Sequence, residues 1–169
     1  MQDDIARAIT SRLKVTLKAG QHASVKVGTS NLEAYQLYSK GRALLSRGGL
    51  DTRPAAKCFE RAVALDPQYG LAWPGLADAR NTLGYSGFDR PEATMPQAKE
   101  AATRAVALDP MLAETHCSLA CSYLLHDWNR REAEREFLRA LELNPRYIQN
   151  LTRLGYTLRP RHGGTRALF

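Results

Sequence analysis

Cysteine is scarce in this sequence, and its scarcity limits how the fold is held together. The chain of 169 residues has three cysteines, Cys58, Cys117 and Cys121. An odd and small number of cysteines excludes a disulfide framework as the basis of the fold. All three lie in segments with helical periodicity, so we expect buried or half-buried thiols that act as small apolar residues.

Long apolar runs are also missing. No stretch approaches the length of about 18 uninterrupted apolar residues that a transmembrane helix needs. The first residues are Met1-Gln2-Asp3-Asp4, whereas a secretory signal peptide starts basic and then turns apolar, so we expect none. By itself the chain is expected to be cytoplasmic. It would be extracytoplasmic if it belongs to a membrane-anchored parent protein.

The central part of the chain lacks an excess of charge of either sign. The formal net charge is +7, but residues 31–145 hold fourteen Lys and Arg against fifteen Asp and Glu. The excess of basic residues therefore lies in residues 1–30 and 146–169. A nucleic-acid interface needs its basic surface on the folded body. The charge distribution instead favours solvated ends over a nucleic-acid interface. Direct nucleic-acid binding by the basic ends is an alternative hypothesis, and it predicts salt-sensitive binding that residues 31–145 alone would lack.

Motifs of catalysis and cofactor binding are absent as well. The sequence contains no nucleophile elbow, P-loop or dinucleotide-binding glycine pattern. A zinc site would have to be built from His116, Cys117, Cys121 and His126. His116 and Cys117 are neighbours, however, and neighbours on a helix point about 100° apart. We therefore predict no catalytic residue, no metal and no cofactor.

Acidic residues in one later segment could also suggest acid–base chemistry. Glu132, Glu134 and Glu136 alternate with arginines in a helical pattern. This arrangement is typical of a solvated helix face with ion pairs along the helix, which is our interpretation.

One phrase is present three times. Residues 62–67 and 105–110 both read Ala-Val-Ala-Leu-Asp-Pro, and residues 140–145 read Ala-Leu-Glu-Leu-Asn-Pro. An alanine seven residues before each phrase and the alanine that begins the phrase lie on one helix face, with a third position between them, and the proline prevents the helix from continuing. The spaced positions are Ala55, Phe59, Ala62 and Pro67, then Ala98, Ala102, Ala105 and Pro110, then Ala133, Phe137, Ala140 and Pro145.

This pattern resembles the tetratricopeptide repeat (TPR), a helix–turn–helix unit of about 34 residues. The first helix of that motif is also visible in each copy. Its positions are matched by Leu37, Gly41 and Leu44, by Trp73, Leu76 and Ala77, and by Leu119, Ala120 and Tyr123. Copy two departs from the motif: it carries about nine extra residues, around 85–94, and Ala102 replaces the usual aromatic residue.

The resemblance implies an all-α fold in which antiparallel helix pairs stack as a right-handed superhelix. It places repeat units at 31–67, 68–110 and 111–145, with helices at 31–48, 52–66, 70–84, 93–109, 112–126 and 130–144. Trp73 is expected to be buried between helices.

Further elements are expected around the three repeats. We predict an amphipathic flanking helix at 1–18, with Ile5 and Ile9 on its apolar face, a linker at 19–30 and a disordered basic tail at 159–169. Residues 147–158 form a helical pattern that can cover the last repeat, so the array with this helix spans 31–158. Because the pattern stops there, a truncation or reading-frame change near residue 150 is a further hypothesis.

A second resemblance comes from the order of the segments. Residues 3–9, Asp-Asp-Ile-Ala-Arg-Ala-Ile, precede a linker and then residues 31–38, Asn-Leu-Glu-Ala-Tyr-Gln-Leu-Tyr. This order looks like large bacterial regulators in which a cyclase, kinase or winged-helix domain is followed by a TolB-like domain and TPR units. The resemblance implies a fragment of a signalling or transcriptional regulator. The alternative is part of an adenylate or guanylate cyclase, or of a DNA-binding regulator, without its output domain.

In stacked repeats of this type the first helices line a concave groove, so the resemblance also implies a peptide-binding surface. The Lys and Asn pattern with which some family members hold a C-terminal carboxylate is absent here. We expect a non-enzymatic protein-interaction module whose partner is a protein or peptide. The groove candidates are Tyr38, Arg42, Leu45, Pro74, Asp78, Asn81, Cys117, Cys121 and Leu124.

Overall fold

Six α-helices and one short 3-10 turn form the described part of the chain. The computed structural model describes residues 28–145, and within them there is no strand. The elements are α2 (Leu32–Arg47), η1 (Gly49–Asp51), α3 (Thr52–Leu65), α4 (Ala72–Tyr85), α5 (Pro91–Leu108), α6 (Ala113–Leu125) and α7 (Arg130–Leu143). Each α-helix begins and ends within about two residues of the bounds expected from the sequence, which confirms the six helix predictions.

The two Asp-Pro copies of the repeated phrase end their helices through the same contacts. The amides of Asp66 and Asp109 make the last helical bonds, to the carbonyls of Ala62 and Ala105, at 3.0 Å in both copies. Each aspartate carboxylate then accepts a hydrogen bond from the amide two residues later, over 3.0 Å from Gln68 and 3.1 Å from Met111. An aspartate followed by proline therefore both stops the helix and starts a turn.

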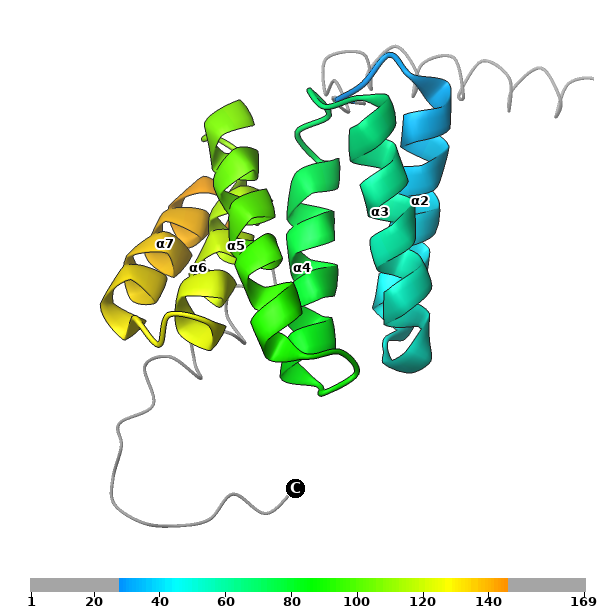
Figure 1. The fold of residues 1–169 in the computed structure, drawn as a ribbon. Coiled ribbons are helices and arrows are strands. Elements are labelled where there is room, and N and C mark those ends of the chain that lie inside the picture. Colours follow the sequence, from blue (N-terminus) through cyan, green and yellow to red (C-terminus); the bar gives the residue numbers. More distant parts are fainter. Residues whose placement is uncertain (1–27, 146–169) are drawn as a thin grey trace, which may run out of the picture.

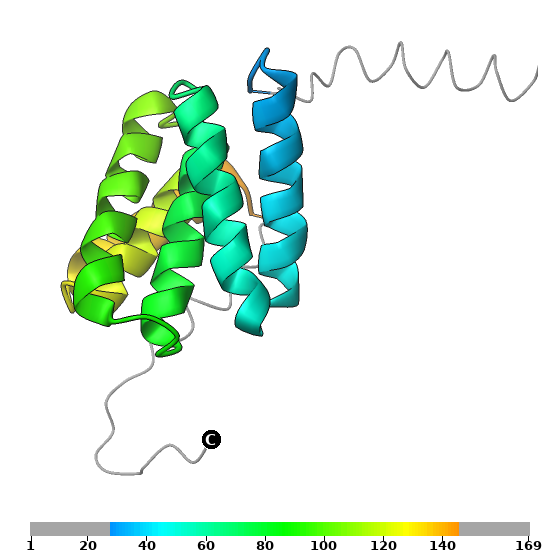
Figure 2. The same cartoon turned by 45° about the vertical axis from the view of Figure 1, so that its right-hand side comes forward.

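The helices pack as three antiparallel pairs, α2 with α3, α4 with α5 and α6 with α7. The pairs are stacked in chain order, from α2 and α3 at one side of Figure 1 to α6 and α7 at the other, and Figure 2 shows the same order from a second direction. Helix α4 contacts α2, α3, α5 and α6, so it joins the first pair to the last. The fold is an all-α helical repeat, as predicted.

Small residues let the helices approach one another closely. The six alanines of the repeated pattern, at positions 55, 62, 98, 105, 133 and 140, have no exposed surface. The buried apolar residues form two clusters, one among α2 to α5 that also includes Leu119 of α6, and one between α6 and α7. Four further buried side chains between α4 and α6 are polar, namely Asp78, Asn81, Ser118 and Ser122.

Phe59 is held between two glycines of neighbouring helices. Its ring is fully buried. A methyl group at Gly41 on α2 would lie 2.9 Å from the ring, and one at Gly75 on α4 would lie 2.5 Å from it. Side-chain carbons do not approach each other that closely, so both positions require glycine while the phenylalanine is present.

Trp73 packs at the start of α4. Its side chain is half-buried against the first core, and its indole Nε1 donates to the carbonyl of Pro67 over 3.0 Å. The fully buried aromatic residue at this junction is Tyr69, whose ring packs edge-on against Tyr38 at 5.2 Å between centroids. Trp73 is thus mostly buried, as predicted, with its indole N–H directed to the turn that precedes α4.

Tyr69 carries a hydroxyl that has no hydrogen-bond partner among the described residues. Burial, followed by the nearby Tyr38, raises the pKa of Tyr69 above its ordinary value. Replacing Tyr69 by phenylalanine should therefore raise the free energy of unfolding by about 1 kcal/mol, because an unpaired buried hydroxyl is costly. Chemical denaturation at neutral pH would measure this, with the exposed Tyr85→Phe as the control that should change nothing.

The same substitution should change the pH dependence of stability. Above about pH 10, an ordinary tyrosine of the unfolded chain loses its proton while buried Tyr69 keeps it. The folded state then holds more protons than the unfolded state, so stability falls as the pH rises through that region. Tyr69→Phe should flatten this fall between pH 9 and 11, and an unchanged slope would contradict the raised pKa.

Several predicted segments lie outside the described residues. These are the flanking helix at 1–18, the linker up to residue 27, the helix at 147–158 and the basic tail at 159–169. The unit boundaries at 31–67, 68–110 and 111–145 remain predictions.

Candidate functional site

The groove candidates fall into two groups in the structure. Tyr38, Arg42, Leu45 and Leu124 are half-buried. Burial raises the pKa of Tyr38, and the nearby Arg42 opposes that rise. The remaining candidates are buried, and they are Pro74, Asp78, Asn81, Cys117 and Cys121.

Asp78 and Asn81 on α4 contact serines of α6. Ser118 Oγ donates to Asp78 Oδ1 over 2.9 Å, and Asn81 Nδ2 donates to Ser122 Oγ over 3.1 Å. Asp78 is only 5% exposed. The prediction that Asp78 is presented to a partner was therefore wrong, because the carboxylate serves to join α4 to α6. We call these four residues the polar seam.

A cavity of about 990 Å3 opens at one end of this seam. It lies where α4 and α6 end and where α5 and α7 begin. Its apolar wall includes Met95, Leu124 and Phe137, and two of the buried groove candidates, Asn81 and Cys121, line it too. The cavity thus brings together Asn81, Cys121 and Leu124, whereas the candidates on α2 do not line it.

Two aromatic side chains mark the mouth of the cavity. Tyr85 and Trp128 line it and are nevertheless 73% and 78% exposed. Trp128 also has a backbone φ of 53°, the only positive φ of a non-glycine residue in the described chain. A bulky residue in this region is strained by about 1–2 kcal/mol, and such strain concentrates at functional sites.

The turn that carries Trp128 is firmly held. The amide of Asn129 donates to the carbonyl of Tyr123 over 2.9 Å, which closes the end of α6. Lys99 on α5 forms an ion pair with Asp127 and lies over the ring of Tyr123, 5.2 Å from its centre. These contacts fix the backbone of Trp128, so its strain and its exposure belong to an ordered turn.

The extra residues of copy two leave the cavity mouth uncovered. Arg53 on α3 donates to the carbonyl of Phe88 and to the carboxylate of Asp89, the latter over 2.8 Å. Phe88 packs against the first core. The loop that follows Tyr85 is thus drawn towards α3, and residues 86–90 do not line the cavity.

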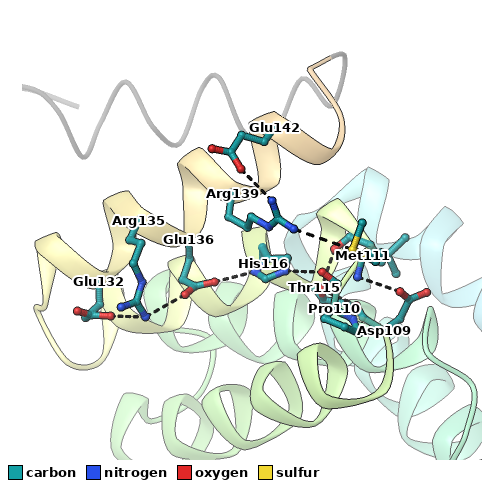
Figure 3. Close-up of polar contacts among 11 residues, drawn as sticks. Asp109, Pro110, Met111, Thr115, His116, Glu132, Arg135, Glu136, Arg139 and Glu142 are labelled. Carbon is teal, nitrogen blue, oxygen red and sulfur yellow. Dashed lines mark hydrogen bonds and ion pairs between the residues drawn. The ribbon is translucent and has the colours of Figure 1, made fainter.

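A buried pair joins α6 to α7 (Figure 3). His116 Nδ1 lies 2.7 Å from Glu136 Oε2, and His116 Nε2 lies 2.8 Å from the carbonyl oxygen of Pro110. Both side chains are about nine-tenths buried, since His116 is 8% and Glu136 9% exposed. Glu132 and Arg135 extend the network to the surface, where Arg135 contacts both glutamates.

The expectation of a fully solvated acidic face on α7 was therefore wrong for Glu136. Glu136 is instead needed to pair the buried histidine. The network fixes α7 against α6 and so positions Phe137, which lines the cavity.

Metal binding and membrane insertion find no support in the described residues. Within 28–145 there is no group of three or more His, Cys, Asp or Glu side chains that could hold a metal ion. Over the same residues no helix is both long and apolar enough to cross a bilayer. Cys58, Cys117 and Cys121 are buried and form no disulfide with one another, as expected.

Comparison with known proteins identifies the fold. No protein-family sequence profile matches the chain, and no curated protein matches it. Among solved structures, the TPR protein TTC0263 of Thermus thermophilus is similar with a TM-score of 0.64 and 22% identity, over 91% of this chain and 78% of that one.

Two further structures are similar over a smaller share of this chain. The first TPR domain of human RPAP3 has a TM-score of 0.60 and 20% identity, over 74% of this chain and 89% of that one. The Sgt2 TPR domain of Aspergillus fumigatus has a TM-score of 0.61 and 18% identity, over 75% and 78%. The chain therefore has the tetratricopeptide-repeat fold.

Proposed function

We propose that this chain is a non-enzymatic protein-interaction module that binds a peptide segment of a partner protein in the cavity between α4, α5, α6 and α7. The observation that carries the proposal is an apolar cavity of about 990 Å3 with two exposed aromatic residues at its mouth. Cavities of roughly 300–1,000 Å3 with mostly apolar walls are typical of binding sites. Exposed aromatic residues are enriched where proteins bind partners.

Similar structures support a role in peptide binding. The first TPR of Spaghetti (RPAP3) is solved with an HSP90 peptide, and the second TPR domain of human RPAP3 with an HSP70 peptide. Those peptides end in acidic residues, for which this sequence lacks the Lys and Asn pattern. The proposed partner of this chain is therefore a different peptide. The groove candidates on α2, namely Tyr38, Arg42 and Leu45, remain predictions for a second contact.

Selection from a library of random peptides displayed on phage tests the proposal. Peptides selected on the full chain should bind Trp128→Gly roughly 30-fold more weakly, since exposed aromatic residues dominate such interfaces. Folding should survive this change. Glycine adopts a positive φ without strain, so the free energy of unfolding should stay unchanged or rise by about 1 kcal/mol.

A matched control separates the cavity from the rest of the surface. Leu50 is 80% exposed and lies in η1, away from the cavity, so Leu50→Ala should bind the selected peptides as wild type does. Peptides that bind all three proteins equally would show that the cavity is not the interaction site. Failure to select any peptide would count against the proposed function itself.

We also propose that the chain is a fragment of a bacterial signalling or transcriptional regulator. The support is the sequence order of residues 3–9, linker and 31–38, which resembles such proteins. The test is to read the DNA that flanks this reading frame. An upstream TolB-like, cyclase or winged-helix coding sequence is the expected result, and unrelated sequence on both sides would refute the idea.

A further inference from the structure

The surface around the cavity mouth carries an exposed aromatic side chain and an apolar cavity side by side. Trp128 is 78% exposed, and its turn is fixed by the hydrogen bond from the amide of Asn129 to the carbonyl of Tyr123. The cavity that Trp128 borders measures about 990 Å3 and has apolar walls, among them Met95 and Phe137. We call this surface, with Trp128 and the cavity, the mouth patch.

Packing among the described residues does not explain Trp128. Its φ of 53° strains the backbone of any residue with a bulky side chain. The exposed indole belongs to neither buried cluster of the described chain, so burial within the chain does not offset that strain. Strained residues concentrate at functional sites, and tryptophan is enriched where proteins bind one another. A contact with another molecule accounts for both the strain and the exposure.

The mouth patch is complementary to a second copy of itself. In a two-fold dimer both subunits use the same patch, so a residue i of one subunit contacts residue j of the other, and j contacts i. Trp128 of each subunit can then enter the cavity of the other. Because Trp128 and the cavity adjoin, one neighbouring subunit occupies both of them, and the assembly closes at two subunits.

The charges at the cavity mouth fit the same arrangement. Glu92, in the first turn of α5, and Arg130, the first residue of α7, are both exposed and both line the cavity. They lie on different helices that form different walls. When the two-fold axis passes between them, Glu92 of each subunit faces Arg130 of the other. The same pair of opposite charges then forms twice, which favours this orientation of the two copies.

We propose that the mouth patch binds a second copy of this chain, in a two-fold dimer in which each Trp128 enters the facing cavity and Glu92 pairs with Arg130. This inference goes beyond the proposed function. The second copy occupies the cavity in which a peptide is proposed to bind, so self-association and peptide binding compete. The protein would thus close its own site at high concentration.

The dimer is expected to be weak. The two exposed aromatic residues of the patch, Tyr85 and Trp128, supply only part of the roughly 800 Å2 per partner of a standard interface. We expect a dissociation constant of about 10–100 μM. The chain is then monomeric at the lower concentrations at which peptides are selected, and Trp128 is free to contact them.

Sedimentation velocity of the full chain from about 1 μM to about 1 mM tests the proposal. The wild-type chain should change from monomer to dimer, and its tryptophan fluorescence should shift to the blue as Trp128 is buried. Trp128→Gly should dimerise at least about 30-fold more weakly. Leu50→Ala removes another exposed apolar side chain, 80% exposed and away from the cavity, and should dimerise as wild type does.

Charge reversal tests the two-fold arrangement itself. Glu92→Arg leaves two basic residues at the mouth, and Arg130→Glu leaves two acidic ones. Each variant alone should dimerise about tenfold more weakly, because like charges face each other. An equal mixture of the two variants should form a heterodimer, since both facing pairs are then of opposite sign. Glu100→Arg is the matched control, because Glu100 is exposed on the same helix as Glu92 and does not line the cavity.

Other results would overturn the proposal. These are a wild-type chain that stays monomeric up to about 1 mM, or a Trp128→Gly variant that dimerises as wild type does. Assemblies larger than a dimer would refute the closed two-fold contact. A mixture of the two charge variants that associates no better than either alone would refute the pairing of Glu92 with Arg130.

The fate of this inference is separable from that of the proposed function. If phage-selected peptides bind a chain that stays monomeric, the inference fails while the proposed function stands. If the chain dimerises through the mouth patch and no peptide is selected, the inference stands and the proposed function fails. Where both hold, a selected peptide should dissociate the dimer, and a dimer that the peptide leaves intact would contradict a shared cavity.

Discussion

Replacing Phe59 by alanine should lower the free energy of unfolding by about 3–5 kcal/mol, the range typical of deleting a fully buried phenylalanine. The ring has no exposed surface and lies between Gly41 of α2 and Gly75 of α4. Removal of the ring leaves a cavity that the two glycines, which have no side chains, cannot fill. Urea denaturation followed by circular dichroism at 222 nm would measure the loss.

A second substitution, Gly75→Ala, tests the same contact, because its effect on stability should have opposite signs in the presence and absence of the Phe59 ring. In the wild-type chain, Gly75→Ala should destabilise, because its methyl group would lie 2.5 Å from the buried ring. In the Phe59→Ala background the same change should stabilise by up to about 1 kcal/mol, since alanine suits a helix better than glycine. An effect of the same sign in both backgrounds would show that the close contact does not govern position 75.

Replacing His116 by alanine should cost about 3–5 kcal/mol, as expected when one partner of a buried pair is removed and the other is left behind. Glu136 would then keep a carboxylate about nine-tenths buried with only Arg135 as a partner at its edge. The carbonyl of Pro110 would lose its donor as well. Because α7 contacts α6 and no other helix among the described elements, α7 should detach first.

Two controls distinguish the loss of the buried His116–Glu136 pair from the loss of a charge at the surface. The double variant His116→Leu with Glu136→Leu should cost less than the two single changes together, because neither buried partner is left alone. Glu142→Gln removes an exposed partner of Arg139 on the same helix and should change stability by less than about 1 kcal/mol. Additive effects of the two leucine substitutions would contradict the pairing.

The sequence predicted the helices well because their signals are local. Periodic alanines, the Asp-Pro stops and the caps depend on residues only a few positions apart. Asn31 illustrates this, since it caps α2 by accepting from the amide of Ala34, three residues later, over 3.1 Å. The repetition of one phrase then implied that the helix pairs stack.

Burial of individual residues was harder to predict, because it depends on contacts between helices far apart in sequence. Trp73 occupies a motif position and is mostly buried, but the fully buried aromatic residue beside it is Tyr69, which belongs to no part of the motif that was used. In the sequence, Glu136 belongs to a pattern of acidic residues that predicts a solvated helix face. It is buried because His116 approaches it from α6.

The candidate site was predicted in part. Asn81, Cys121 and Leu124 were chosen by their position in the repeat, and they meet in the cavity. Tyr85 and Trp128 were not chosen as site residues, although a lone tryptophan in a short turn between two helices is a signal that could have been used. The cavity itself could not be foreseen, since it depends on the polar seam and on the loop that Arg53 draws towards α3.

The central place of α4 has a consequence for how the molecule moves with time. This helix contacts four others, whereas α7 contacts only α6 among the described elements. In a stack whose contacts join near neighbours, brief openings start at the ends and rarely reach the middle. Backbone amides of α4 should therefore exchange with solvent most slowly and those of α7 most quickly. One wall of the cavity lies on α4, whose amides should exchange most slowly, and another lies on α7, whose amides should exchange most quickly. The width of the cavity is therefore set by the motion of α7 against a fixed α4.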